Sequence, residues 1–342
     1  MAFQIIWFVL WSVLWSLYFM TDGFVMGCGM LHFTLGKTEV KRRMLVKSIG
    51  PVWNGNEVWL VTAAGATFAA FPAMYAVMFS CMYPVVLMLL FSLIVRGVSL
   101  EFRDKQQPAA LKKIWDAGIF MGGFLPAFLF GVVFGNIFSG LPLDAAGYHG
   151  TLGLLLRPYA LLTGALFTGL FSVHGAIYSA IKNEGELGAQ AEKTAKRLWP
   201  FLLGVAALFL IVSRWATGLF DNYSRAPLLL AVPLAAVAAL AAIRWFLAKR
   251  QLGRSFVASC GCIVMVVLTG VIGLFPNLIP SRPDRSFSLT IFNASSGPYT
   301  LRIMTIVAFI FVPVVIAYKI WVYRIFRGKI SEDEVMASEE AY

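Results

Sequence analysis

The residues of this chain that could move a proton lie in short polar stretches of an otherwise apolar sequence. Asp22 and Glu57 stand inside two such stretches, and Asp116 lies near the edge of a later apolar run. Asn54 shares a helical face with Glu57 because the two are three residues apart. Ionisable groups inside apolar segments are costly and are usually functional. These four side chains therefore predict either a proton path or a buried polar seam that clamps helices together.

The stretch around Asp22 also bears on the shape of the first helix. A continuous helix from Phe3 to Gly36 would be about 50 Å long, which is more than a bilayer requires. The sequence Thr21-Asp22-Gly23 is therefore predicted to be either a break in the helix or a point of close helix packing. Asp22 would then either relay a proton or bond to backbone groups that the break sets free.

The composition indicates what kind of molecule must position these groups. Of 342 residues, 59% are apolar or aromatic and 13% are charged, whereas soluble domains carry about 25% charged residues. The mean hydropathy is +0.78. A soluble or disordered chain is therefore excluded, and the sequence predicts an all-α, polytopic integral membrane protein built as a helical bundle.

About nine apolar segments are long enough to cross a bilayer as helices, and they lack the alternation of barrel strands. Lys and Arg concentrate in every second loop, with Arg96 and Lys319 counted among these loop charges. The positive-inside rule therefore predicts an N-out/C-in topology, which explains the net charge of +11 without a nucleic-acid partner. We expect a single transmembrane domain over residues 1–330 and a short acidic cytoplasmic tail over residues 331–342. The expected spans are residues 3–31, 50–72, 75–96, 114–139, 153–181, 198–218, 226–247, 256–279 and 302–325.

Residues that could bind a haem or a metal ion are scarce. The histidines are His32, His149 and His174, and the expected topology puts them at different depths, so that no two face each other across a haem. The four cysteines lack the Cys-x-x-Cys spacing of zinc sites. We therefore expect no catalytic group in this chain, no metal site, and no haem held by this chain alone.

The polar stretches resemble those of one family. The most specific motifs are Thr21-Asp22-Gly23-Phe24 and Trp53-Asn54-Gly55-Asn56-Glu57-Val58-Trp59. Further matches are Arg42-Arg43, Arg96-Gly97-Val98 and Trp115-Asp116-x-Gly118. Together these motifs resemble subunit II of the cytochrome bd-type quinol oxidases, most densely in the first 140 residues.

This resemblance implies a subunit of a terminal oxidase in the prokaryotic cytoplasmic (inner) membrane. Such a complex oxidises membrane quinol, reduces dioxygen to water and contributes to the proton-motive force. The resemblance places haems b and d and the quinol site in the partner, subunit I, with which this chain would form a heterodimer. A small accessory subunit and a bound membrane lipid or quinone are also compatible with the family.

The resemblance further implies roles for two positions. The region by which oxygen enters is associated with the tryptophan that matches Trp59. The proton route is associated with a carboxylate that the family often has where this chain has Asn54. Because an asparagine cannot exchange a proton, a route at this position must use water, Glu57 or a carboxylate of subunit I. We expect Glu57 or Asp22 to take that part.

Two other functions are compatible with the same residues. Spans with buried carboxylates and glycine-rich helices also suit an ion-coupled secondary transporter. A transporter would usually repeat such features in two related halves, whereas here they are confined to the first two expected spans. A purely structural subunit, without a part in proton or oxygen delivery, is the other alternative.

Overall fold

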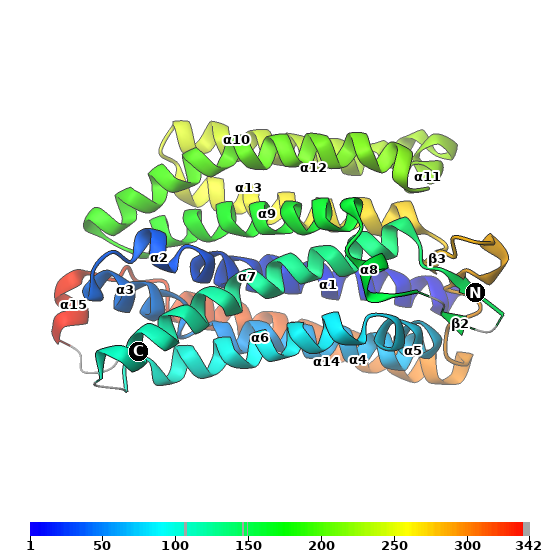
Figure 1. The fold of residues 1–342 in the computed structure, drawn as a ribbon, viewed down its shortest axis with the longest axis horizontal. Coiled ribbons are helices and arrows are strands. Elements are labelled where there is room, and N and C mark those ends of the chain that lie inside the picture. The colour runs from blue at the N-terminus through cyan, green and yellow to red at the C-terminus, as the bar shows by residue number, and fades with distance from the viewer. Residues whose placement is uncertain (106–107, 146, 149, 338–342) are drawn as a thin grey trace.

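The computed structural model describes residues 1–105, 108–145, 147–148 and 150–337, and long helices that run side by side dominate it (Figure 1). The long helices are α1 (Ala2–Met30), α3 (Glu39–Ile49), α4 (Trp53–Ala70), α5 (Pro72–Cys81), α6 (Tyr83–Phe102), α7 (Ala109–Ser139), α9 (Pro158–Lys182), α10 (Gly185–Ala216), α12 (Ala231–Ala248), α13 (Leu252–Leu274) and α14 (Pro298–Ile325). The short elements are α2 (His32–Leu35), α8 (Leu152–Leu155), α11 (Asp221–Arg225), α15 (Glu332–Ala337), the 3-10 helices η1 (Pro227–Leu230) and η2 (Arg285–Phe287), and the strands β1 (Leu143–Asp144), β2 (Gly147–Tyr148), β3 (Asn277–Ile279) and β4 (Leu289–Thr290).

Within the described residues, eight helices are long and apolar enough to span a membrane, and a bent segment raises the number to nine. That segment runs through α3 and α4 and turns by 116° into α5. The predicted all-α bundle of about nine spans is therefore confirmed. The N-terminus and α15 lie at opposite ends of the bundle (Figure 1), as an odd number of crossings requires. Which end faces the cytoplasm remains a prediction.

The third expected span, residues 75–96, was wrong in its boundaries. The chain breaks between α5 and α6, and α6 continues to Phe102. Pro72 and Pro84 stand in the first turns of α5 and α6, respectively. A proline fits there because the first helical N–H groups have no partner to lose. The break that divides the expected span thus lies beside Pro84, whereas Pro72 starts α5 directly after α4.

Helix α1 lies at the centre of the bundle and touches α4, α7, α9, α13 and α14. It passes through Asp22 and Gly23 without a break, so the predicted break is wrong and the alternative of close packing holds. Gly27 lies against Gly175 of α9, and Gly29 lies against Gly123 of α7. A Cβ atom on Gly27 would collide with the α9 backbone, so glycine is needed for this approach.

Three tryptophans of α1 fix the first helix against its neighbours. Trp7 donates a hydrogen bond to the backbone oxygen of Leu301 at 3.0 Å, and Trp11 donates one to Thr67 Oγ1 at 2.8 Å. Trp15 packs edge-on against Phe134 of α7. All three indoles are buried, so they connect α1 to α14, α4 and α7 through the interior of the bundle.

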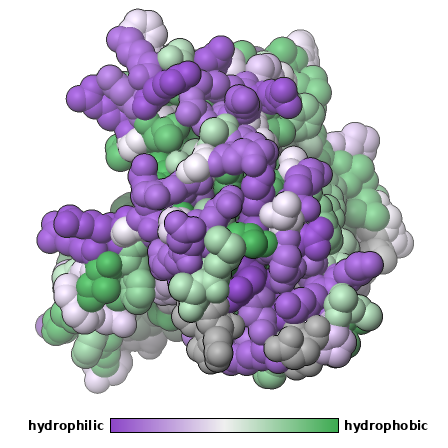
Figure 2. Space-filling model, turned by 90° about the vertical axis from the view of Figure 1, so that its left-hand side faces the viewer, coloured by the Kyte–Doolittle hydropathy of each residue, from purple (hydrophilic) through white to green (hydrophobic). Residues whose placement is uncertain are grey.

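The end of the bundle that carries α2, α3 and α15 is predominantly hydrophilic (Figure 2). Part of the acidic tail is held there rather than extending away. Lys182 Nζ donates to the backbone oxygens of Phe326 and Gly328, and Lys47 forms an ion pair of 2.8 Å with Glu334 of α15. The tail segment through residue 337 therefore lies against α3 and α9.

Candidate functional site: two charged clusters along α1, α6 and α7

The first cluster joins the two carboxylates inside the apolar segments through one arginine. Arg96 of α6 contacts Asp22 of α1 and Glu57 of α4 with the same nitrogen, Nη2, at 2.9 Å and 2.6 Å. The side chains of Asp22 and Arg96 are at most 1% exposed, whereas that of Glu57 is 25% exposed. One cation therefore serves two carboxylates, and only the second reaches the surface of the chain.

Several buried polar atoms around this cluster have no hydrogen-bond partner among the described residues. They are Asp22 Oδ1, Arg96 Nε and Nη1, Ser99 Oγ and the Tyr18 hydroxyl. Buried polar atoms of this kind are where proteins bind ordered water. A carboxylate, a guanidinium and two hydroxyl groups around Asp22 therefore have hydrogen-bonding capacity that the described residues do not use.

Asn56 connects the first cluster to the last long helix. Its Nδ2 donates to the backbone oxygen of Thr21 at 2.7 Å, and its Oδ1 accepts from the Tyr323 hydroxyl at 2.7 Å and from Lys319 Nζ at 3.4 Å. Asn56 is fully buried. One amide therefore bridges α1 and α14, beside the position where Asp22 pairs with Arg96.

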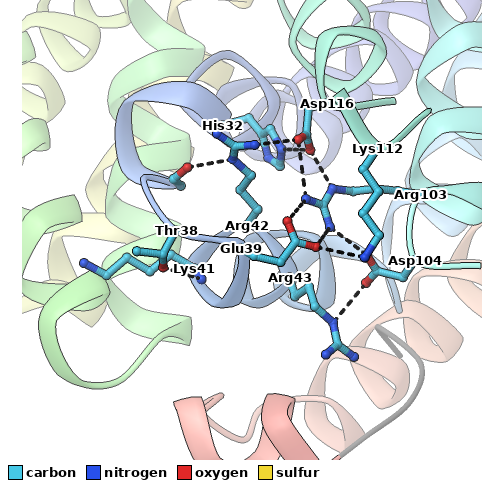
Figure 3. A network of polar contacts seen from close by, with 11 residues as sticks. His32, Thr38, Glu39, Lys41, Arg42, Arg43, Arg103, Asp104, Lys112 and Asp116 are labelled. Carbon is cyan, nitrogen blue, oxygen red and sulfur yellow. Dashed lines mark hydrogen bonds and ion pairs between the residues drawn. The ribbon is translucent and has the colours of Figure 1, made fainter. Parts of the chain in front are cut away.

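The second cluster surrounds Asp116 of α7 at the hydrophilic end of the bundle (Figure 3). Asp116 Oδ1 accepts hydrogen bonds from His32 Nε2 at 2.6 Å and from Arg103 Nε at 2.5 Å. Asp116 Oδ2 accepts one from Arg42 Nη1 at 2.8 Å. Arg103 also bonds to Glu39 Oε2 at 2.9 Å. This cluster therefore ties α2, α3 and the end of α6 to α7.

The bonding of Asp116 suits a fixed clamp better than a proton carrier. Two of its three partners are arginines, which stay protonated in proteins. Burial lowers the pKa of His32 below its ordinary value, so at neutral pH this ring is uncharged and donates one hydrogen bond to the carboxylate. A carboxylate with both oxygens occupied by such donors has little tendency to accept a proton.

The four candidate residues thus separate into groups. Asp22 and Glu57 meet at Arg96, whereas Asp116 belongs to the other cluster and bonds to Arg103. The helical rise from Arg96 to Arg103 separates the two clusters by about 10 Å along α6. The side chain of Asn54 is exposed and makes no hydrogen bond within the part of the chain that the structure describes. Asn54 and Glu57 share one face of α4, as predicted, but this face points away from the core of the bundle.

Sequence reasoning missed three polar residues of the first cluster. Arg96 and Lys319 were counted as loop charges, yet both lie inside helices and are at most 8% exposed. Asn56 was noted only as part of a polar motif. The available signal was that Arg96 and Lys319 each stand within or at the edge of an expected span, where a charge needs a partner.

An apolar cavity of about 440 Å³ lies between α1, α4, α5, α6 and α7. Its lining includes Trp11, Trp15, Ala64 and Phe134. Trp59, the residue expected to mark oxygen access, is buried at 3% exposure and does not itself line this cavity. Leu60 and Val61, which follow Trp59 on α4, do line it.

The described histidines do not suit haem ligation. His174 uses both ring nitrogens, with Ser259 Oγ at 2.6 Å and the backbone oxygen of Met20 at 3.0 Å, and His32 bonds to Asp116. His149 lies outside the described residues. Among the residues that the structure describes, three or more His, Cys, Asp or Glu side chains nowhere gather as a metal site. Both described histidines are therefore engaged in hydrogen bonds within the bundle.

Fold and site together define a class: a polytopic membrane subunit that holds charged groups at membrane depth and whose described histidines are already engaged. The family model for cytochrome bd terminal oxidase subunit II matches residues 3–326. The chain therefore belongs to this family. It is a multi-pass protein of the bacterial cytoplasmic membrane.

Individual relatives agree along nearly the whole chain. Cytochrome bd ubiquinol oxidase subunit 2 of Bacillus subtilis is 36% identical over 332 residues, which cover 97% of this chain and 98% of the relative. Cytochrome bd-I ubiquinol oxidase subunit 2 of Escherichia coli K12 is 34% identical, with 97% and 96% covered. A chain of the bd oxidase structure from Geobacillus thermodenitrificans superposes with a TM-score of 0.79 at 16% identity, covering 95% of this chain and 99% of that one, and so shares the fold. None of these matches supports the alternative of a secondary transporter.

Proposed function

We propose that this chain is the non-haem subunit II of a quinol:oxygen oxidoreductase, working as a heterodimer with a haem-bearing subunit I. Membership of the family and the names of the relatives support this activity. Subunit I would hold haems b and d and the quinol site, because the described histidines of this chain are committed to other bonds. The complex would reduce dioxygen to water and contribute to the proton-motive force.

The observation that carries the role of this subunit is the buried Asp22–Arg96–Glu57 cluster. A charged triad at membrane depth is costly, so a function has to be sought for it. Asp22 is fully buried and its Oδ1 has no hydrogen-bond partner among the described residues, whereas Glu57 reaches the surface, so together they would take up a proton inside and deliver it outward. We propose that Asp22 and Glu57 form part of the proton route, and that Asp116 belongs to a structural clamp.

The exposed polar residues of α4 support a proposal for the surface on which subunit I docks. Asn54, Glu57, Val61 and Phe68 form one stripe on α4 in which an exposed amide and a partly exposed carboxylate accompany large apolar side chains. Contact of such polar groups with lipid is unfavourable, whereas a protein partner can bond to them. We propose that this stripe faces subunit I and that Glu57 passes protons to it.

The apolar cavity beside α4 supports a part in oxygen delivery. Dioxygen is apolar and dissolves in hydrocarbon, and the cavity has tryptophan, phenylalanine and aliphatic walls next to the docking stripe. We propose that oxygen enters from the membrane near Trp59 and collects in this cavity before it reaches subunit I.

The proton part of this proposal is tested with Glu57→Gln and Asp22→Asn in the complete complex. Both changes remove a proton-exchanging carboxylate while they keep size and hydrogen bonding. We expect each variant to retain haem spectra and subunit I but to lose about tenfold or more of quinol-driven oxygen consumption and proton uptake.

Glu332→Gln is the matched control, because Glu332 is exposed in the tail. It should leave both rates unchanged. Unchanged rates in both Glu57→Gln and Asp22→Asn would remove these residues from the proton route and leave this chain as a structural subunit.

A further inference from the structure

Lys319 is a charged residue of α14, and the function proposed above assigns no role to it. It stands well within this membrane-spanning helix, and 8% of its surface is exposed. Among the described residues its one hydrogen-bond partner is Asn56 Oδ1 at 3.4 Å, which is a long contact. An ammonium group has three donors. At least two of them are therefore left for groups outside the described protein atoms.

The surroundings of Lys319 are shaped to admit its ammonium group. Nζ lies directly beside Gly55, so a Cβ atom at this position would push the flexible end of the lysine side chain out of its present place. Gly55 and Asn56 belong to the polar motif of α4 that also supplies Asn54 and Glu57. The glycine in this motif thus makes room for a lysine that lies far away in the sequence.

A purely structural explanation of Lys319 is weak. An unpaired ammonium in an apolar bundle loses its hydration, and a well-packed apolar side chain would usually be as stable or more stable. The tie between α14 and α4 does not need the charge, because the neutral Tyr323 hydroxyl already donates to the same Asn56 oxygen at 2.7 Å. The ammonium is therefore retained for something other than fastening the helix.

The charged groups around Lys319 point to proton exchange. Asn56, the hydrogen-bond partner of Lys319, also donates to the backbone oxygen of Thr21. The next residue is Asp22, whose Oδ1 has no hydrogen-bond partner among the described residues. Asp22 is in turn paired with Arg96 of α6, which pairs with Glu57 of α4. Arginine does not release its proton, whereas a buried lysine can.

We propose that Lys319 is the proton-exchanging group that takes the part Asn54 cannot take, and that it supplies protons to Asp22. The ammonium gives one proton to the Asp22 carboxylate through water, which leaves a neutral amine and a neutral carboxyl group. The amine then takes up a proton from the end of the bundle that carries α15, and Asp22 passes its proton on. This inference rests on the proposed proton route through Asp22 and Glu57.

The decisive variant is Lys319→Arg in the complex with subunit I, reconstituted into proteoliposomes. It keeps the positive charge and the donors but removes the ability to exchange a proton. We expect normal haem spectra and subunit content, about a tenfold or larger loss of quinol-driven oxygen consumption and proton uptake, and a larger solvent deuterium isotope effect on kcat. Lys319→Met should lose activity to the same degree.

The control is Lys329→Arg, the same change at an exposed lysine of the chain, which should leave the rates unchanged. A full rate and an unaltered isotope effect in Lys319→Arg would overturn the proposal. So would loss of the haem-bearing complex in both Lys319 variants, because the lysine would then serve assembly.

The same measurements separate this inference from the proposed function. Slow Asp22→Asn and Glu57→Gln with a normal Lys319→Arg would leave the proton route standing without the lysine. A slow Lys319→Arg with normal Asp22→Asn and Glu57→Gln would overturn the inference, since the lysine would then have no carboxylate to supply.

Discussion

Arg96 is the residue on which the charge balance inside the bundle depends. It is 1% exposed and is the one cation that contacts both Asp22 and Glu57 among the described residues. Lys319, held by Asn56, is the second cation of this cluster, so the cluster is neutral when all four groups are ionised. In the proposed proton route, a proton that passes from the lysine to a carboxylate would therefore leave the net charge of the cluster unchanged.

Replacing Arg96 by Gln should destabilise the complex more than any change at the surface. Removing one partner of a buried ion pair leaves the other charge uncompensated, at a cost of about 3–5 kcal/mol. We expect a much lower yield of haem-bearing complex and a lower midpoint of thermal unfolding. Combining Arg96→Gln with Asp22→Asn should restore part of the yield. A double variant as unstable as the sum of the two single ones would contradict the pairing.

At the scale of elements, α1 is the axis against which the other helices are placed. In the C-terminal half of α1, glycines let the backbone approach α9 and α7 closely. In the N-terminal half, tryptophans donate hydrogen bonds to α14 and α4. Asp22 stands between these two regions. The position of the carboxylate relative to Arg96 is therefore set by how closely α1 packs along its whole length.

Gly27→Val should separate α1 from α9. Two methyl groups would have to fit where the backbones of Gly27 and Gly175 now touch, so the helices must move apart. Overpacking of this kind costs about 1–3 kcal/mol. We expect a lower thermal midpoint and slower oxygen consumption, because Asp22 moves with α1. Gly261→Val, where an added Cβ meets no atom within 4 Å, is the control and should be tolerated.

At the scale of the whole molecule, polar and apolar surfaces are divided by position. The end with α2, α3 and α15 is hydrophilic (Figure 2), while long helices such as α14 expose apolar side chains along their length. The clamp around Asp116 joins α2, α3 and the end of α6 to α7 (Figure 3), and the apolar cavity lies between α1, α4, α5, α6 and α7. In the proposed function, protons and oxygen would therefore reach the docking stripe on α4 by separate routes.

Filling the cavity should affect oxygen and leave proton transfer unchanged. Ala64→Phe places a ring among the residues that line the cavity, at a distance from the Asp22–Arg96–Glu57 cluster along α4. We expect the KM for oxygen to rise severalfold while kcat at saturating oxygen stays the same. An oxygen electrode with the purified complex measures both constants. An unchanged KM would show that oxygen reaches subunit I by another way.

The sequence alone was sufficient to predict the fold class and the family, because both depend on short continuous stretches of the chain. Hydropathy over some twenty residues defines a span, and the polar motifs around Asp22 and Glu57 are continuous stretches. The third span failed at its boundaries because the chain breaks within it, where Pro84 stands in the first turn of α6. Which end of the bundle is cytoplasmic is still inferred from the loop charges.

Only the tertiary structure decided which polar residues act together. Arg96 and Lys319 count as basic residues near the ends of spans when the sequence is read, yet each is folded against a residue far away in the chain. Asp116 resembled Asp22 as an isolated acid in an apolar run, but its neighbours are two arginines and a histidine. The partner of a buried charge is set by helix packing, and helix packing brings together residues whose separation along the chain carries no signal.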